Sequence, residues 1–153
     1  MDRKLNEVLV LLRGNEMAMN RLYQQYAESF PEDRVFWLEI GDQEFFHAEE
    51  IDKLRGLVAA GSLYPAKVTI QAEAIKANIG YINNLIEECR RGSLSKKKAY
   101  TLALDLEKAI LERKFLNILN FSMSEDYKSV RDKLLAETES HRQHISAKLS
   151  SLK

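Results

Sequence analysis

Apolar residues recur at spacings of three and four along almost the whole chain, and stretches of alternating apolar and polar residues are nearly absent. That spacing is the period of an amphipathic α-helix, whereas alternation would indicate a β-strand. Only two prolines and six glycines interrupt the sequence, so long segments can stay helical without a break. The pattern therefore predicts an all-α fold.

Breaks in the pattern divide the chain into five expected helices: 3–29, 31–60, 68–90, 95–120 and a last one that begins at 122 or 124 and ends near 149. Pro31 suits the first turn of a helix, and Gly61 suits the residue that follows a helix end. Ser95 is a favourable N-cap for the fourth helix, and Ser122 or Ser124 for the last.

Only a few residues link the first helix to the second, and the fourth to the last. A short link makes consecutive helices antiparallel neighbours. The expected architecture is therefore a bundle of two antiparallel hairpins, with the 68–90 helix as an additional segment. Because the chain has 153 residues and no Pro- or Ser-rich linker, we expect a single domain over 1–153.

Composition and charge narrow the possible functions. Basic and acidic side chains balance at 23 each, which disfavours a nucleic-acid or membrane-surface partner. The longest apolar run, 8–12, is far too short to cross a membrane. Cys89 is the only cysteine, so it allows neither an intramolecular disulfide nor a four-cysteine metal site. We expect a cytoplasmic protein.

Polar residues lie in the middle of the apolar stripe of four expected helices. They are Glu16 in the first helix, Glu44 and His47 in the second, Glu107 in the fourth, and Thr138 and His141 in the last. A carboxylate in an apolar interior costs a large desolvation energy or loses its charge. Such groups therefore need a compensating partner opposite them.

These inward residues are expected at one level of the bundle. Counted from a turn near position 30, Glu16 lies fourteen residues before it, and Glu44 and His47 lie fourteen and seventeen after it. Counted from a turn near position 124, Glu107 and His141 lie seventeen residues away on either side. Three carboxylates and two imidazoles should therefore converge at mid-height.

Residues 44–47 also form a Glu-x-x-His motif, whose first and last side chains project from one helix face and can hold one metal centre. Alone the motif is weak, because it occurs often by chance. A metal-free alternative is a buried polar network or ion pair, with Lys114 as a cation on the same face as Glu107. Lys114 lies two turns away, too far to neutralise all three carboxylates.

With these residues the chain resembles the ferritin-like di-iron carboxylate superfamily, and specifically its rubrerythrin-like four-helix bundles. The resemblance is carried by Glu16 with Tyr23 seven positions on, by the 44–48 motif, by Glu107 and by the 137–141 segment. It implies that the 68–90 helix is a crossover between parallel second and fourth helices. It also implies a site for one or two iron ions, or manganese or zinc, with these metal ligands: Glu16, Glu44, His47, Glu107 and His141.

Thr138 departs from the family pattern, because a glutamate is expected at its position. A hydroxyl is a poor substitute for a carboxylate, so the second metal should bind weakly or not at all. Glu137 lies at the flank of the stripe and could replace the ligand only if the last helix rotated or distorted; we expect water in the vacated place. Tyr23 can donate a hydrogen bond to a ligating carboxylate and orient it.

The resemblance implies a non-haem iron protein that reduces peroxide or oxidises Fe(II). One cysteine cannot build the rubredoxin module of full-length rubrerythrins, so an external electron donor would be needed. The alternative is a helical scaffold or binding protein with a degenerate, metal-poor site, which Thr138 favours. An iron-storage shell is a third candidate. Because rubrerythrin-like domains often associate, the resemblance also implies a homodimer as the partner arrangement.

Overall fold

The computed structural model describes residues 3–61, 64–65, 71–112, 121–122 and 125–152. These residues form five α-helices, α1 (Arg3–Ser29), α2 (Arg34–Ala59), α3 (Ala72–Arg90), α4 (Lys96–Glu112) and α5 (Glu125–Ser151), with a 3-10 turn, η1 (Pro31–Asp33). The all-α prediction is confirmed. A two-residue antiparallel pair, β1 (Tyr64–Pro65) with β2 (Phe121–Ser122), was not predicted.

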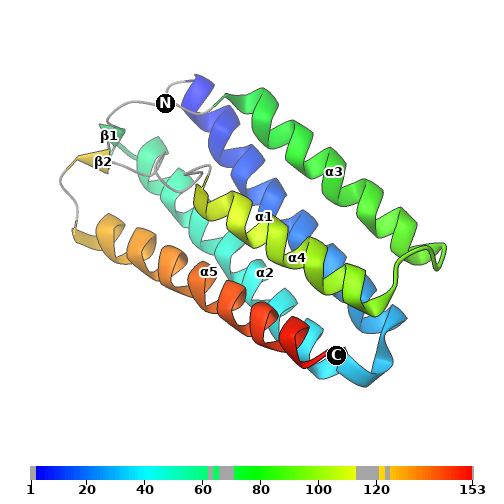
Figure 1. Cartoon of the computed structure of the whole chain (residues 1–153). Helices are drawn as coiled ribbons and strands as arrows, with labels where there is room; N and C mark the ends of the chain where they lie inside the picture. The colour runs from blue at the N-terminus through cyan, green and yellow to red at the C-terminus, as the bar shows by residue number, and fades with distance from the viewer. Residues whose placement is uncertain (1–2, 62–63, 66–70, 113–120, 123–124, 153) are drawn as a thin grey trace.

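Helices α1 and α2 form an antiparallel hairpin, visible as the blue and cyan helices of Figure 1. The N–H of Phe30 donates to the carbonyl of Tyr26 at 2.8 Å and closes the end of α1. Pro31 opens the 3-10 turn rather than α2 itself, which begins three residues later than expected. At the other end of α2, Gly61 adopts a φ of 75°, a conformation that costs glycine little because it has no Cβ.

Helix α3 lies beside α1 and returns the chain to the end where α2 begins, so that α4 runs in the same direction as α2 (Figure 1). The segment expected to start at 68 is helical from Ala72; positions 66–70 lie outside the described residues. Between α3 and α1, buried Asn78 donates a 2.7 Å side-chain hydrogen bond to Asn15. The Nδ2 donor of Asn78 and the Oδ1 acceptor of Asn15 thereby have the partner that burial demands.

Helices α4 and α5 pack against each other as the second hairpin. Ser95 caps α4 as predicted, because its Oγ accepts from the N–H of Lys98 at 3.1 Å. The expected continuation of α4 to 120, Lys114 and the Ser124 cap lie outside the described residues, and Ser122 lies in β2. Within the described part of the chain, none of the helices is both long and apolar enough to span a bilayer.

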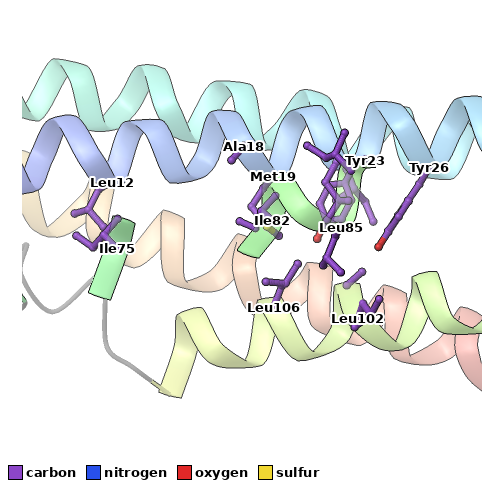
Figure 2. Packing of buried hydrophobic residues seen from close by; sticks show 14 of the residues in the cluster. Leu12, Ala18, Met19, Tyr23, Tyr26, Ile75, Ile82, Leu85, Leu102 and Leu106 are labelled. Atoms are coloured by element: carbon purple, nitrogen blue, oxygen red, sulfur yellow. The ribbon is translucent and has the colours of Figure 1, made fainter. Parts of the chain in front are cut away.

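The apolar core takes residues from all five helices, including Trp37 of α2 and Leu134 of α5, and part of it lies between α1, α3 and α4. Figure 2 shows Met19, Tyr23 and Tyr26 projecting from α1 toward the leucines of the other two helices. Burying one such side chain stabilises the fold by about 1.5–3 kcal/mol. The polar cluster described next lies within this packed interior, on helices that the core holds in place.

Candidate metal centre

Five predicted ligands, supplied by α1, α2, α4 and α5, lie together and are almost fully buried. Their exposed fractions are 6% for Glu16, 2% for Glu44, 2% for His47, 1% for Glu107 and 1% for His141. Helical periodicity explains this placement, because each residue occupies the apolar stripe of its own helix. The convergence expected from counting along the hairpins is therefore present in the structure.

The cluster divides into two overlapping groups of potential ligands. One oxygen or nitrogen atom from each of Glu16, Glu44 and His47 lies within 4.8 Å of the others. The same holds for Glu44, Glu107 and His141. Because Glu44 belongs to both groups, its two oxygens can serve two neighbouring cations.

Both imidazoles turn the same ring nitrogen toward Glu44. The Nδ1 atom of His47 lies 3.2 Å from one carboxylate oxygen of Glu44, and the Nδ1 atom of His141 lies 3.0 Å from the other. The His141 Nδ1 atom is also 3.6 Å from Glu107. The rings lie nearly parallel, with centroids 5.5 Å apart. Nδ1 is therefore the atom through which either histidine could bind a cation here.

The outer nitrogens of the two histidines have different partners. Nε2 of His47 contacts the carboxylate of Glu137, whereas Nε2 of His141 contacts the side-chain oxygen of Gln43. A hydrogen bond at one imidazole nitrogen fixes the tautomer and presents the other nitrogen as a ligand. Sequence analysis missed Gln43, because this contact joins α2 to α5 and no spacing within one helix indicates it.

The structure specifies what Thr138 and Glu137 do. Thr138 is buried at the predicted position, and its hydroxyl donates to the Leu134 carbonyl of the preceding turn at 2.8 Å. Its single proton is thus used within α5. Glu137 stays at the flank, with a side chain 33% exposed, and reaches His47 from outside rather than replacing the missing carboxylate.

Tyr23 makes the contact that the sequence predicted. Its hydroxyl donates a 2.7 Å hydrogen bond to Glu107 and so holds that carboxylate in place. Burial, followed by the charges of Glu107 and Glu44, raises the pKa of Tyr23 well above its usual value. Tyr23 therefore remains a protonated donor at neutral pH.

The three carboxyl groups differ in protonation. Burial and the neighbouring charge of Glu44 raise the pKa of Glu16 well above its ordinary range, which favours its protonated form. Burial opposes ionisation of Glu44 too, but hydrogen bonds from Glu16 and the two histidines outweigh it and lower its pKa. For Glu107, burial and the charge of Glu44 raise the pKa to about 7.

The histidines balance this negative charge. Burial disfavours the imidazolium of His141, but hydrogen bonds to Glu107 and Glu44 outweigh burial and raise its pKa to about 10. The pKa of His47 is raised by Glu44 and Glu137 against the same opposing effect of burial. Without a cation, the cluster is therefore a hydrogen-bonded network in which imidazolium offsets carboxylate.

One buried atom in the cluster is left unsatisfied. Oε2 of Glu16 is buried and has no hydrogen-bond partner among the described residues. Such an orphan oxygen costs about 1–3 kcal/mol. A divalent cation between Glu16, Glu44 and His47 would satisfy it, and the mixed oxygen and nitrogen donors suit iron, manganese or zinc. The donor set therefore fits a metal ion.

No family model, curated protein or solved structure matches this chain. The resemblance to rubrerythrin-like proteins therefore remains an expectation from the residues of the sequence.

Proposed function

We propose that this chain is a ferritin-like four-helix bundle of the rubrerythrin type, with α3 as its crossover helix, and that it binds iron at the buried cluster. The observation that carries the proposal is the position of Glu44, whose two oxygens face Nδ1 of His47 and Nδ1 of His141. A carboxylate shared by two histidine-containing groups is the arrangement expected of a site for two cations.

In this proposal each residue has a defined role. Glu16, Glu44 and His47 hold one ion, and Glu44, Glu107 and His141 hold a second. Iron held by these residues would supply the one-electron chemistry needed to reduce peroxide or dioxygen, with an external donor as the source of the electrons. Tyr23 donates a 2.7 Å hydrogen bond to Glu107, which would keep that carboxylate oriented toward a bound ion.

Thr138 makes the two positions unequal. A glutamate at position 138 would place a second shared carboxylate between the two ions and neutralise part of their charge. The Thr138 hydroxyl cannot do so, because it is neutral and already donates its proton to the Leu134 carbonyl. We propose that one ion binds tightly and the second weakly. The His47 position is the tighter one, because Glu137 adds a negative partner to its imidazole, whereas His141 has neutral Gln43.

The second candidate function is a helical scaffold or binding protein with no productive metal. One specific observation favours it: the imidazolium of His141 is hydrogen-bonded to Glu44 and 3.6 Å from Glu107, so part of the buried charge is already compensated. Buried ion pairs of this kind persist in proteins without any metal.

Anaerobic titration with Fe(II), followed by peroxide consumption with an external reductant, separates the two functions. The iron protein should take up at least one Fe(II) per chain and consume peroxide only when loaded. Glu44→Gln should abolish both properties, because it removes the shared ligand. Glu49→Gln is the matched control, since Glu49 lies on the same helix but is exposed. If the wild type takes up no Fe(II), or if wild type, Glu44→Gln and Glu49→Gln take up equal amounts, the scaffold function is favoured.

A further inference from the structure

A groove lies between α2 and α5, which run side by side as the cyan and the orange-to-red helices of Figure 1. Its volume of about 570 Å³ falls within the range of about 300–1,000 Å³ that is typical of small-molecule sites. The lining includes two aliphatic side chains, Ile40 and Ala147, and one aromatic ring, Phe36. Among the described residues that line the groove, Glu39 of α2 is acidic and none from α5 is. The groove therefore combines an apolar surface with a small number of polar groups.

The ammonium of Lys148 is the cation of this groove. It is exposed, and its Nζ lies 5.3 Å from the centre of the Phe36 ring. No carboxylate in the described part of the chain forms an ion pair with it. Asp33, whose charge interacts with Lys148, is already held by Tyr100 at 2.7 Å and by Lys96 at 2.9 Å. A cation over an exposed ring is held weakly, so Lys148 can leave the ring for an anion in the groove.

Phe36 gives the groove a flat apolar wall. Its ring is half-buried and packs edge-on against Trp37, with centroids 5.1 Å apart, and at a tilt against Tyr100 at 5.7 Å. These contacts with fully buried rings hold Phe36 in place from the core side. Contact between two aromatic rings is favourable beyond the burial of apolar area. A ligand that carries a planar ring therefore suits this wall.

The other end of the groove can bind a hydroxyl group. Gln43 lies two helical turns from Phe36, about 10 Å along α2, and Glu39 lies between them. The Gln43 amide oxygen contacts Nε2 of His141, whereas the amide nitrogen has no hydrogen-bond partner among the described residues. The exposed carboxylate of Glu39 has none there either. A hydroxyl at this end can accept from the Gln43 amide and donate to Glu39.

A groove of similar size between α1 and α3 lacks these features. Its volume is about 510 Å³, and two arginines line it. Arg21 donates to Asn83 at 3.4 Å, and Arg90 pairs with Glu87. Both guanidinium groups thus have partners, and no aromatic ring is among the described residues that line this groove. The α2–α5 groove differs in both respects.

We propose that the groove between α2 and α5 binds a small aromatic carboxylate with a hydroxyl at the opposite end of its ring, a compound of the para-hydroxybenzoate type. The carboxylate pairs with Lys148, the ring lies against Phe36, and the hydroxyl reaches Gln43 and Glu39. None of these contacts requires a metal ion. The inference therefore goes beyond the proposed function and does not depend on it.

Calorimetric titration of metal-free protein with para-hydroxybenzoate, in the presence of a chelator, tests the proposal. Wild type should bind one ligand per chain and saturate at millimolar concentrations or below. Lys148→Gln should weaken binding about tenfold, because it removes the charged partner of the carboxylate. Lys148→Arg should restore most of the affinity. Lys133→Gln is the matched control, since Lys133 is exposed on the same helix and outside the groove, and it should bind like wild type.

Related compounds test each part of the ligand. The neutral para-hydroxybenzyl alcohol should bind several-fold more weakly than para-hydroxybenzoate to wild type, and equally weakly to Lys148→Gln. Benzoate, which lacks the hydroxyl, should also bind more weakly to wild type. Gln43→Ala should reduce the difference between benzoate and para-hydroxybenzoate, because it removes one partner of the hydroxyl.

Two-dimensional NMR locates the bound ligand. The backbone amide signals that shift should belong to positions 36–43 and 144–151. The absence of saturable binding at millimolar concentrations, or equal binding by wild type and Lys148→Gln, would overturn the proposal. Shifts centred on Arg21 and Arg90 would also overturn it, because the carboxylate would then bind where no aromatic wall is present. A chain that binds no iron would contradict the proposed function and leave these measurements unaffected.

Discussion

Glu44 and His141 face each other across the α2–α5 interface, with a carboxylate oxygen 3.0 Å from Nδ1. Both side chains are almost fully buried, so this contact is made in an environment of low dielectric. Glu44 holds His47 in the same way from its own helix. The shared carboxylate thus couples the two hairpins.

Replacing Thr138 by glutamate should have opposite effects with and without metal. In metal-free protein, Thr138→Glu adds a fourth buried carboxyl and should lower the free energy of unfolding by about 1–3 kcal/mol. With iron, the new side chain restores Glu-x-x-His with His141 and should raise occupancy of the weaker position. Melting temperatures and iron stoichiometry, measured on both forms, check this. Unchanged stoichiometry would show that Thr138 is not the limiting residue.

Glu16 should matter for metal binding and little for the metal-free fold. Its raised pKa favours the neutral carboxyl, and one of its oxygens has no hydrogen-bond partner among the described residues, so Glu16→Gln replaces this group by a neutral one of similar shape. The free energy of unfolding without metal should change by less than about 1 kcal/mol. Metal uptake should fall, because an amide is a poor anionic ligand. Chemical denaturation measures the free energy of unfolding, and metal analysis of the same preparations measures uptake. If Glu16→Gln does not fold without metal, the neutral form of Glu16 is contradicted.

The stability of the metal-free protein should decrease as the pH rises. The folded pKa of His141 is raised from 6.5 to about 10, so its stabilising contribution is complete below pH 6.5 and disappears as the pH passes through about 10. Glu107 acts in the same direction, because its folded pKa is raised from 4.5 to about 7 and its neutral form is favoured. Thermal melts should show the melting temperature of the metal-free protein falling as the pH rises. In His141→Asn the part of this fall that occurs at alkaline pH should be absent.

Metal affinity should show the opposite pH dependence. Bound protons on His141 and Glu16 compete with a cation, so affinity should increase with pH over the range in which the metal-free protein loses stability. Titration with Co(II), followed by its absorption spectrum, measures this directly. Affinity that is independent of pH would mean that these groups are not ligands.

The partners of the outer imidazole nitrogens should tune the two positions separately. Glu137→Ala removes the carboxylate that contacts His47 and should weaken metal binding by about tenfold. Gln43→Ala should act on the His141 position, while Gln43→Glu should retain an acceptor and recover most of the affinity. The Co(II) spectrum should shift with each change, which a purely structural role would not produce. Gln143→Ala, on the exposed side of α5, is the control and should have no effect.

Periodicity was enough to predict the inward face of each helix, and counting from the hairpin turns was enough to place Glu16, Glu44 and Glu107 at one level. The contacts of Gln43 and Glu137 with the two histidines could not be predicted from the sequence. They depend on how α5 is rotated about its own axis relative to α2, and a small rotation would bring a different residue of the flank to each histidine. The β1–β2 pair is two residues long, too short for any alternating pattern.

The central claim is that the cluster around Glu44 binds metal, and elemental analysis of protein purified without a chelator tests it most directly. Iron, manganese and zinc should together amount to between one and two ions per chain in wild type and in Glu49→Gln. They should fall to near zero in Glu44→Gln. Wild-type protein that contains no metal, and gains none on incubation with Fe(II), would contradict the claim and leave the cluster a buried hydrogen-bonded network.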